Sequence, residues 1–394
     1  MHQPRLWTKN FLIDAVTNLF VYLVYYFLMV TIAAYSSDHL QASPSEAGLA
    51  SGIFILGALV ARIFAGRAID QVGQKKILYC GLVFYLITTL LYFVANNLML
   101  LFVIRFLHGA GFGISATATG TIVAGIIPCA RRGEGTSYYA MSATLASAIG
   151  PFLGMMLIRQ GDFDTVLILS VILLAASLIA TFFLTIPEVK FTKEQMDKIK
   201  GFSLHYFFEI KAIPISIIGV LIGLSFSSIL SFLTSYTREI NLVGPGSFFF
   251  VVYAASILIS RPLTGRWFDQ RGENFVMYPS FFLFAIGLLI LSQAHHGFLL
   301  LLAGVFVGLG YGTFLSSAQA IAIKVSPAHN MGLATSTFFS FIDGGVGIGP
   351  FLLGFLVPAT GFRGMYLGMV FVVFACSFLY YFLHGKKTPG META

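Results

Sequence analysis

Charged residues are scarce in this chain: they make up 10% of its 394 residues, whereas hydrophobic residues make up 57%. Soluble domains carry roughly 25% charged residues, so this chain has too few to cover a water-soluble fold of its length. Most of its surface must therefore face lipid. Because the basic residues stand in short clusters between apolar runs, the net charge of +7 does not indicate a nucleic-acid partner.

Cysteine is also rare, with three residues at Cys80, Cys129 and Cys376 and no Cys-x-x-Cys pair. This excludes a disulfide framework and a cysteine-based metal site. The HExxH and paired-carboxylate motifs of membrane-embedded enzymes are missing, so we predict no enzyme, metal site or cofactor. A cleavable signal peptide is not expected either, because the first apolar run, about 11–34, is too long for its apolar segment.

Twelve apolar runs are long enough for a helix to cross the hydrocarbon core, which takes about 20 residues. A membrane β-barrel would instead show shorter segments of alternating polarity. The sequence therefore predicts an all-α membrane protein with 12 transmembrane helices. The predicted spans are roughly 11–34, 47–66, 77–95, 98–125, 136–158, 165–186, 213–236, 247–265, 275–294, 298–323, 332–358 and 364–384.

The basic residues predict the orientation of these spans. If both termini are cytoplasmic, 17 of the 23 Lys and Arg residues lie inside, three lie outside and three fall within spans. This distribution follows the positive-inside rule. Together with short loops and no N-x-S/T acceptor site, it predicts a multi-pass protein of a bacterial inner membrane.

The segment 187–212 differs from the rest, because it holds five Lys and four acidic residues between two sets of six spans. We predict an N-terminal six-helix bundle at 1–186, a cytoplasmic linker at 187–212 and a C-terminal six-helix bundle at 213–394. The second part of the linker, 202–211, is amphipathic enough to lie along the inner membrane surface.

The two predicted bundles are copies of one another. The segment ARIFAGRAIDQVGQKK at 61–76 reappears as SRPLTGRWFDQRGENF at 260–275, 199 residues later. About 90 residues keep this offset, which excludes chance. Paired six-helix halves are typical of transporters that rock around a central site. The same offset relates Gly109, Gly111 and Gly113 to Gly308, Gly310 and Gly312, and Gly150-Pro151 to Gly349-Pro350.

On these motifs the chain resembles the major facilitator superfamily. The motif G-x-x-x-D-x-x-G stands at Gly66–Gly73 and Gly265–Gly272, and Arg105-Phe-Leu-His-Gly109 resembles the R-x-x-Q-G motif of proton-coupled members. The segment 146–154 resembles the antiporter motif G-x-x-x-G-P-x-x-G-G, although two of the motif's glycines are replaced. His108 stands where the family usually has Gln.

Within this superfamily the chain resembles the drug:proton antiporter-1 group and its sugar-efflux and metallophore-export relatives. The resemblance implies secondary active transport by alternating access, with proton-coupled efflux of a small organic solute or drug. Proton-coupled import, or export of one metabolite such as a sugar or metallophore, remains an alternative. The proton gradient is then the energy source, no cofactor is needed, and we expect a functional monomer whose partners are lipid, protons and a small-molecule substrate.

The repeated motif predicts a gate. We expect Asp70 to face a helix N-terminus across the interface of the two halves, where a carboxylate is favoured by about 0.3–1 kcal/mol. We also expect the glycines of the motif to permit a tight turn and close backbone approach. The alternative is a plain turn whose lysines only set the orientation. The predicted gating residues are Gly66, Asp70, Gly73, Lys75, Gly265, Asp269 and Gly272.

The antiporter-like motif predicts a bent span 5. Pro151 removes a helix hydrogen bond, while Gly150 and Gly154 let helices approach closely. Such a bend can serve rocking of the bundle, or it can be a static kink.

Ionisable residues inside spans are functional hypotheses, because each costs about 2.5–3.5 kcal/mol at the bilayer centre. At about 1.5 Å per residue, Asp343 lies about 16 Å from the inner edge and Arg105 about 10 Å from the outer one, so the two can approach across a closed cavity. Asp14 lies only about 5 Å from the inner edge, and we do not expect it to pair with Arg105.

We therefore predict that Asp343 binds the coupled proton, since a cavity of low dielectric constant favours its protonated form, and that Arg105 senses its charge. His108 is the alternative proton carrier, or else a neutral structural imidazole.

Polar side chains at helical spacing predict a substrate cavity, because polar faces of apolar helices turn away from lipid. Interhelical hydrogen bonding is the alternative for the serines. Arg105 suits an anionic or zwitterionic solute and Asp343 a cation, so the charge of the substrate stays open. The predicted cavity residues are Asn18, Tyr22, Tyr25, Phe112, Ser115, Ser228, Ser231, Tyr311, Gln319 and Ser340.

Overall fold

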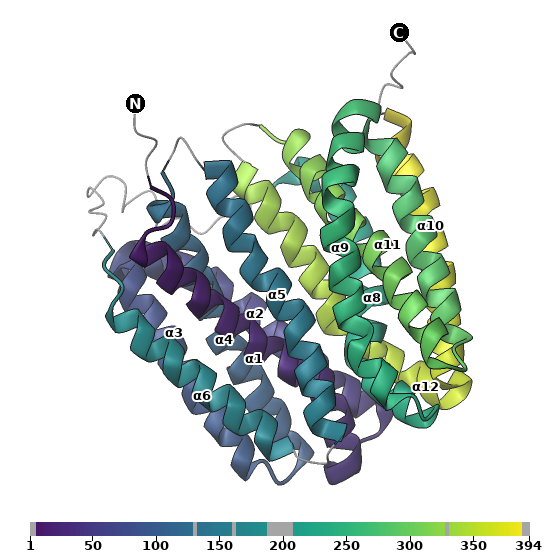
Figure 1. Ribbon diagram of the computed structural model, residues 1–394, viewed down its shortest axis with the longest axis horizontal. Coiled ribbons are helices and arrows are strands. Elements are labelled where there is room, and N and C mark those ends of the chain that lie inside the picture. The colour runs from purple at the N-terminus through teal and green to yellow at the C-terminus, as the bar shows by residue number, and fades with distance from the viewer. Residues whose placement is uncertain (1–4, 129–131, 160–162, 187–207, 328–330, 388–394) are drawn as a thin grey trace. The chain divides into compact units, whose positions relative to one another are not determined.

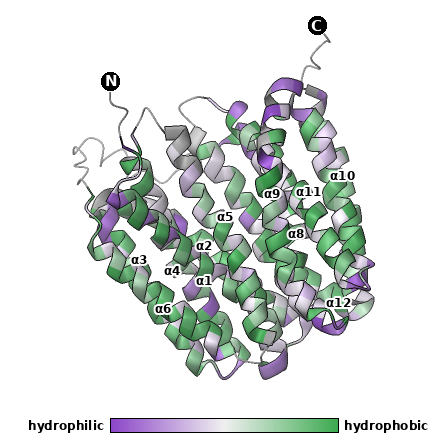
Figure 2. Ribbon diagram, in the orientation of Figure 1, coloured by the Kyte–Doolittle hydropathy of each residue, from purple (hydrophilic) through white to green (hydrophobic). Residues whose placement is uncertain are grey.

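The computed structural model describes residues 5–128, 132–159, 163–186, 208–327 and 331–387, and nearly all of them lie in helices (Figure 1). Eleven helices in this part of the chain are long and apolar enough to cross a membrane. Hydrophobic residues cover most of each helix, and hydrophilic ones gather largely near helix ends (Figure 2). Large apolar side chains such as Ile259, which is 73% exposed, suit a surface that faces acyl chains.

The last helix accounts for two predicted spans. Helix α12 covers Met331–Leu383, or 53 residues, and at 1.5 Å per residue it is about 80 Å long, more than twice the roughly 30 Å of hydrocarbon. Gly361 interrupts it with a non-helical backbone (φ 67°, ψ 175°). Because only glycine readily adopts this positive φ, the chain turns here, between the predicted spans 332–358 and 364–384. The prediction of a 12-helix membrane fold is therefore confirmed.

The described chain forms two compact units. Unit 1 consists of residues 1–41 and 53–201, and unit 2 of residues 42–52 and 202–394. The predicted linker 187–212 lies mostly outside the described residues, so the domain boundaries stay a prediction. The helices before the linker are α1 (Lys9–Leu40), α2 (Pro44–Val72), α3 (Gln74–Leu90) with the 3-10 turn η1 (Leu91–Val94), α4 (Leu98–Ile126), α5 (Arg132–Arg159) and α6 (Phe163–Phe182). After it come η4 (Ile210–Ala212), α8 (Ile213–Glu239), α9 (Val243–Arg271), α10 (Glu273–Ser292), α11 (Gly297–Lys324), α12 and η6 (Gly385–Lys387).

Local sequence signals set where two important helices begin. Thr8 precedes α1 and its hydroxyl accepts a hydrogen bond from the backbone of Phe11, while Asn97 precedes α4 and accepts one from Leu100. Such caps satisfy backbone donors that the first helical turn leaves unpaired.

The repeated glycines make the same contacts in both halves. A Cβ atom on Gly109 of α4 would lie 1.9 Å from the backbone oxygen of Phe54, and one on Gly308 of α11 would lie 2.5 Å from that of Tyr253. Tyr253 follows Phe54 by the same 199 residues that separate the glycines. These positions exclude any side chain, so the duplicated sequence builds duplicated packing. The correspondence extends to Gly111 against Tyr85 and Gly310 against Phe284.

The predicted loop between spans 2 and 3 is almost entirely helical, so the prediction was wrong in length. Helix α2 continues to Val72 and α3 begins at Gln74, which leaves only Gly73, with φ 103°, between them. The run of apolar residues ends near Gly66, but the helix continues past it. A helix outside lipid needs no apolar side chains to keep its backbone hydrogen bonds. Gly272 repeats the turn with φ 84°.

The close approach expected at Gly66 belongs to the interface of the two halves, so it stays a prediction. No heavy atom of the described residues lies within 4 Å of the position that a Cβ on Gly66 would take, and Gly265 is equally open. Within this motif, only the glycines of the turn itself have a conformational reason to be glycine.

Candidate functional site

Arg105 is the largest side chain that is fully buried in the described protein. It lies on α4, where Nη1 donates to the Tyr92 hydroxyl at 3.3 Å and Nη2 lies 3.8 Å from the sulfur of Met29. Its guanidinium carbon is 4.6 Å from the centre of the Phe54 ring. Because a guanidinium cannot be deprotonated in proteins, unit 1 holds a permanent positive charge in its core, and the aromatic face stabilises it.

His108 continues this network towards α3. Its Nδ1 lies 3.3 Å from the Tyr92 hydroxyl and its Nε2 lies 3.0 Å from Oγ1 of Thr89. Thr89 donates its own proton to the backbone oxygen of Tyr85 at 2.8 Å, so its hydroxyl is free to accept from Nε2. Tyr92 accepts from Arg105 and can donate to Nδ1. All donors point one way, from Arg105 through Tyr92, His108 and Thr89 to the α3 backbone.

This direction favours the neutral imidazole among the two predicted roles of His108. A second ring proton would add charge beside the buried Arg105 guanidinium. The network is complete without that proton. The predicted roles of His108, as proton carrier or as neutral structural imidazole, and of Arg105, as sensor of the Asp343 charge, stay predictions.

Among the described residues, the network around Arg105 has no counterpart in the second half. At the offset of 199, Arg105 and His108 correspond to Gly304 and Val307, whereas the aromatic neighbours are kept. Phe54 and Phe112 lie 5.4 Å apart, and their counterparts in the second half are Tyr253 and Tyr311. The two halves therefore share aromatic residues at these positions, whereas the ionisable pair is present only in the first half.

Several predicted cavity residues meet in one aromatic cluster. Tyr25 stacks on Phe112 with ring centres 5.0 Å apart, and Tyr22 meets the same ring edge-on at 5.2 Å. Arg62 lies over the Phe112 ring at 5.7 Å. In unit 2, Tyr311 stacks on Phe226 at 3.9 Å. Aromatic faces flanked by cationic groups can stack with flat organic groups.

Asn18 binds neighbouring helices. Its Nδ2 donates to Ser142 on α5 at 2.7 Å, and its Oδ1 accepts from Thr119 on α4 at 3.1 Å. All three side chains are buried. Asn18 therefore links α1 to α4 and α5 by interhelical hydrogen bonds in this structure.

The predicted serines differ from one another. Ser115 and Ser228 donate to backbone oxygens of their own helices, at 2.8 and 2.6 Å. The hydroxyl of Ser231 is buried without a hydrogen-bond partner among the described residues. Ser340 and Gln319 are half-buried. The hydroxyl of Ser231 is thus available to a ligand.

The two predicted charge sites belong to different units. Asp343 lies on α12 and is half-buried, whereas Arg105 lies in unit 1. Their mutual approach stays a prediction. Asp14, which we placed near the inner edge, is fully buried on α1.

Lys75 has a partner that sequence patterns did not reveal. Its ammonium group donates to the backbone oxygens of Leu184 at 2.6 Å and Phe182 at 3.3 Å, at the end of α6. A cation is favoured there, because the last carbonyl groups of a helix carry partial negative charge. Lys75 therefore ties the start of α3 to the end of α6. The side chains of Asp70 and Asp269 lie outside the described residues, so their gating role stays a prediction.

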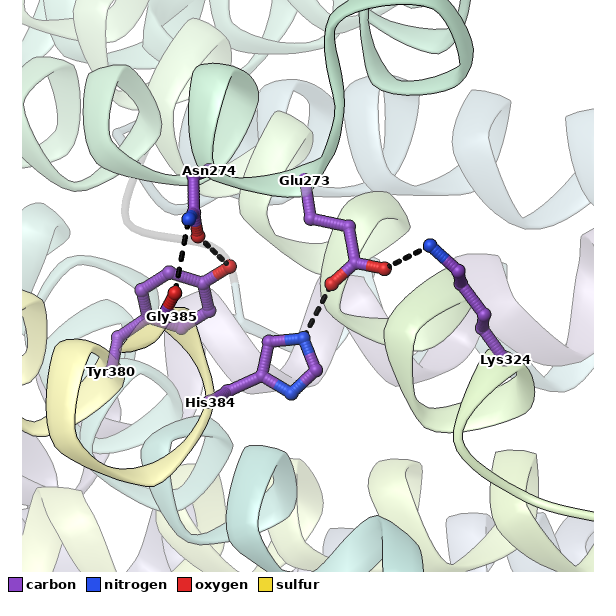
Figure 3. Close-up of polar contacts among 6 residues, drawn as sticks. All are labelled: Glu273, Asn274, Lys324, Tyr380, His384 and Gly385. Atoms are coloured by element: carbon purple, nitrogen blue, oxygen red, sulfur yellow. Dashed lines mark hydrogen bonds and ion pairs between the residues drawn. The ribbon is translucent and has the colours of Figure 1, made fainter. Parts of the chain in front are cut away.

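The second half makes the same connection with different chemistry (Figure 3). Asn274, the counterpart of Lys75, donates to the backbone oxygen of Gly385 at 3.1 Å and accepts from Tyr380 at 2.9 Å. Beside it, the buried carboxylate of Glu273 pairs with Lys324 at 2.6 Å and with His384. These contacts join the ends of α10, α11 and α12.

The antiporter-like motif seats α5 on α1. A Cβ on Gly150 would lie 2.6 Å from Cβ of Tyr26, and one on Gly154 would lie 3.1 Å from the backbone oxygen of Phe27. Helix α5 continues across Pro151. The glycines are thus explained by close packing, which does not depend on the direction of transport.

Comparisons with known proteins agree with this architecture. The solved structure of a POT family transporter has a TM-score of 0.80 and 15% sequence identity, with 96% of each chain covered, which shows a shared fold. Fold and helix composition define a multi-pass helical membrane protein. The family model described as "Major Facilitator Superfamily" matches residues 15–282 and 215–393. The chain belongs to this superfamily, and it is a transporter rather than an enzyme.

Three curated relatives span nearly the whole chain. An uncharacterised MFS-type transporter of Methanocaldococcus jannaschii is 26% identical, with 91% of this chain and 94% of the relative covered. The staphylopine export protein of Staphylococcus aureus is 24% identical, with 89% of each covered. Multidrug resistance protein 1 of Bacillus subtilis is 22% identical, with 86% and 88% covered. Relatives of this chain thus include efflux-type transporters of bacteria.

Proposed function

We propose that this protein exports a small organic solute in exchange for protons, by alternating access of its two halves. The observation that carries the proposal is the permanent charge of Arg105, buried beside the aromatic cluster of α1 and α4. A charge inside a membrane span is costly, so a charge that is kept there points to a function. Relatives named for export and for multidrug resistance support the outward direction.

In this mechanism Asp343 carries the coupled proton. It loads from the outer side and releases inside, and a substrate that enters from the cytoplasm favours the deprotonated carboxylate. One charge moving through the membrane potential contributes about 2.3 kcal/mol per 100 mV. At 1.36 kcal/mol per tenfold change, this sustains a gradient of roughly fifty-fold, which is ample for efflux.

The cellular setting follows from the same proposal. We place the protein in the inner membrane of a prokaryote as a monomer, with both termini in the cytoplasm. Export of a specific metabolite such as a metallophore is the second candidate, because the staphylopine export protein matches 89% of the chain. A thermal-shift screen with drugs, sugars and amino-acid-derived chelators separates these substrate classes.

Transport in proteoliposomes tests the mechanism. Transport of a ligand identified in the screen is measured under an imposed pH gradient, with wild-type protein and with Asp343→Asn. Asp38→Asn, at an exposed position, is the matched control. We expect the gradient to drive transport in wild type and the control but not in Asp343→Asn. Unchanged gradient-driven transport in Asp343→Asn rejects Asp343 as the proton site. If the ligand moves in the same direction as the protons, the protein is an importer.

A further inference from the structure

Helix α9 carries a stripe of exposed side chains towards its end. Leu263, Trp267 and Arg271 follow one another at intervals of four residues, so they lie along one face of the helix. All three are exposed, Leu263 by 51% and Trp267 by 41%. Earlier in the same helix, Ile259 is also exposed. An apolar face this open marks a surface that other molecules cover, and in a membrane these molecules are lipids.

The stripe becomes more polar towards the end of α9. Its aliphatic part is followed by Trp267, whose apolar ring carries one N–H donor, and then by Arg271, which carries a permanent positive charge. At 1.5 Å per residue, Arg271 lies about 18 Å from Ile259 along the helix. This order matches one leaflet of a bilayer, in which tryptophan prefers the level of the headgroups and cations lie at the phosphates.

This end of α9 lies on the side that is predicted to be cytoplasmic. The turn at Gly272 leads into α10, where Asn274 donates to the backbone oxygen of Gly385 at 3.1 Å (Figure 3). Gly385 lies near the C-terminus, which the distribution of basic residues places in the cytoplasm. The stripe therefore crosses the inner leaflet, whose anionic phospholipids give the membrane surface a negative potential.

Aromatic rings hold Arg271 in place. Its guanidinium carbon lies 4.7 Å from the centre of the Phe275 ring. This ring meets Trp267 edge-on, with ring centres 6.0 Å apart. The rings orient the arginine without neutralising it, and among the described side chains no carboxylate pairs with it. The charge of Arg271 is therefore pre-organised for an anion that comes from outside the chain.

The other charges near the stripe are compatible with an anion. Arg266, next to Trp267, is exposed and adds a second cation. Glu273 is buried and pairs with side chains of α11 and α12. Asp269 stands two residues from both Trp267 and Arg271, which is about 200° around the helix, so its backbone lies on the opposite side of α9 from the stripe.

The first half of the chain lacks these residue types at the equivalent positions. At the offset of 199, the counterparts of Trp267, Arg271 and Phe275 are an alanine, a valine and Lys76. The stripe is therefore a property of the second half and not of the shared fold. Because Lys76 is an exposed cation close to the equivalent turn, it offers a matched control.

We propose that the stripe of α9 binds an anionic glycerophospholipid of the inner leaflet. The phosphate contacts the guanidinium of Arg271, and an acyl chain lies along Leu263 and Ile259. Arginine suits a phosphate, because its N–H groups can form two parallel hydrogen bonds with the oxygens. A zwitterionic lipid carries its own cation beside the phosphate, so the site prefers a lipid with a net negative charge. Binding here depends neither on the transported solute nor on proton coupling.

Trp267 itself can report on the lipid, because the chain has only two tryptophans. The Trp7→Phe variant, in which Trp267 is the only one left, is reconstituted into vesicles with phosphatidylglycerol or phosphatidylcholine whose acyl chains are brominated. Bromine quenches tryptophan fluorescence on contact. At equal mole fractions, we expect phosphatidylglycerol to bind beside Trp267 roughly fivefold better than phosphatidylcholine, which corresponds to about 1 kcal/mol for one arginine at an anionic surface.

Further variants in the Trp7→Phe background identify the group that binds the phosphate. Arg271→Gln should remove the preference for phosphatidylglycerol, and Phe275→Leu should weaken it, because the ring that orients the arginine is lost. Lys76→Gln should leave it unchanged. All three positions are exposed, so we expect these variants to fold, with unchanged emission spectra in vesicles without bromine.

Three results overturn the proposal. The first is equal quenching by the two lipids in the parent Trp7→Phe protein. The second is a preference that survives Arg271→Gln, or one that falls as much in Lys76→Gln, because the lipid would then respond to the overall charge of the surface. The third is loss of the preference on addition of glycerol 1-phosphate, which would make the site one for soluble phosphate esters.

Discussion

Replacement of Tyr92 by phenylalanine tests the one-way network around Arg105. Tyr92 is 2% exposed, so water cannot replace its hydroxyl. The change removes an acceptor for Arg105 and the donor to Nδ1 of His108. A buried group that loses its partner costs about 1–3 kcal/mol, and both bonds are 3.3 Å long, near the weak end of the range. We therefore expect a loss of about 2 kcal/mol, or roughly 30-fold in the folding equilibrium.

Reversible unfolding in mixed detergent micelles measures this loss. Tyr381→Phe is the matched control, because Tyr381 is 46% exposed. In a His108→Leu background, Tyr92→Phe should cost about 1 kcal/mol less, since one of the two bonds is already gone. Equal losses in Tyr92→Phe and the control, or strict additivity with His108→Leu, would refute the network.

Three further changes probe the packing and the helix ends. Gly109→Ala places a methyl group 1.9 Å from a backbone oxygen. It should lower the free energy of unfolding by about 3 kcal/mol or more and lower the yield of folded protein. Gly265→Ala, in open space, should leave yield and melting temperature unchanged. Lys75→Met should weaken the end of α6 by about 0.3–1 kcal/mol and speed hydrogen exchange there, an effect absent from Lys76→Met at an exposed position. Glu273→Gln should cost about 1 kcal/mol, because its partner lysine is largely exposed; no change in melting temperature would show that the ion pair is energetically neutral.

Much of the fold was predictable because its signals are local or repeated. A run of apolar residues long enough to cross the membrane predicts a helix whatever its neighbours are, since lipid offers no hydrogen bonds to an open backbone. The offset of 199 residues predicted that Gly109 and Gly308 occupy equivalent positions. Their close contacts with the backbones of Phe54 and Tyr253 agree with this prediction. The turn glycine at Gly73 was predictable from its motif as well.

The site was less predictable, because its contacts join residues far apart in the chain. Polarity alone placed Arg105, His108 and Asn18 away from lipid, but no local pattern points to Tyr92 as the bridge between the first two. The same holds for Lys75, whose partner carbonyls are more than 100 residues away.

The sequence by itself determined that this chain crosses a membrane many times in two related halves. The length of apolar runs and an internal repeat can both be recognised from the order of the residues alone. Only the tertiary structure decided which polar atoms have partners. It satisfied the amide of Asn18 and placed His108 between Tyr92 and Thr89, while it left the carboxyl of Asp14 buried without a hydrogen-bond partner among the described residues. Hydrogen bonds depend on distances of a few tenths of an ångström between helices, and these distances arise only when the helices pack.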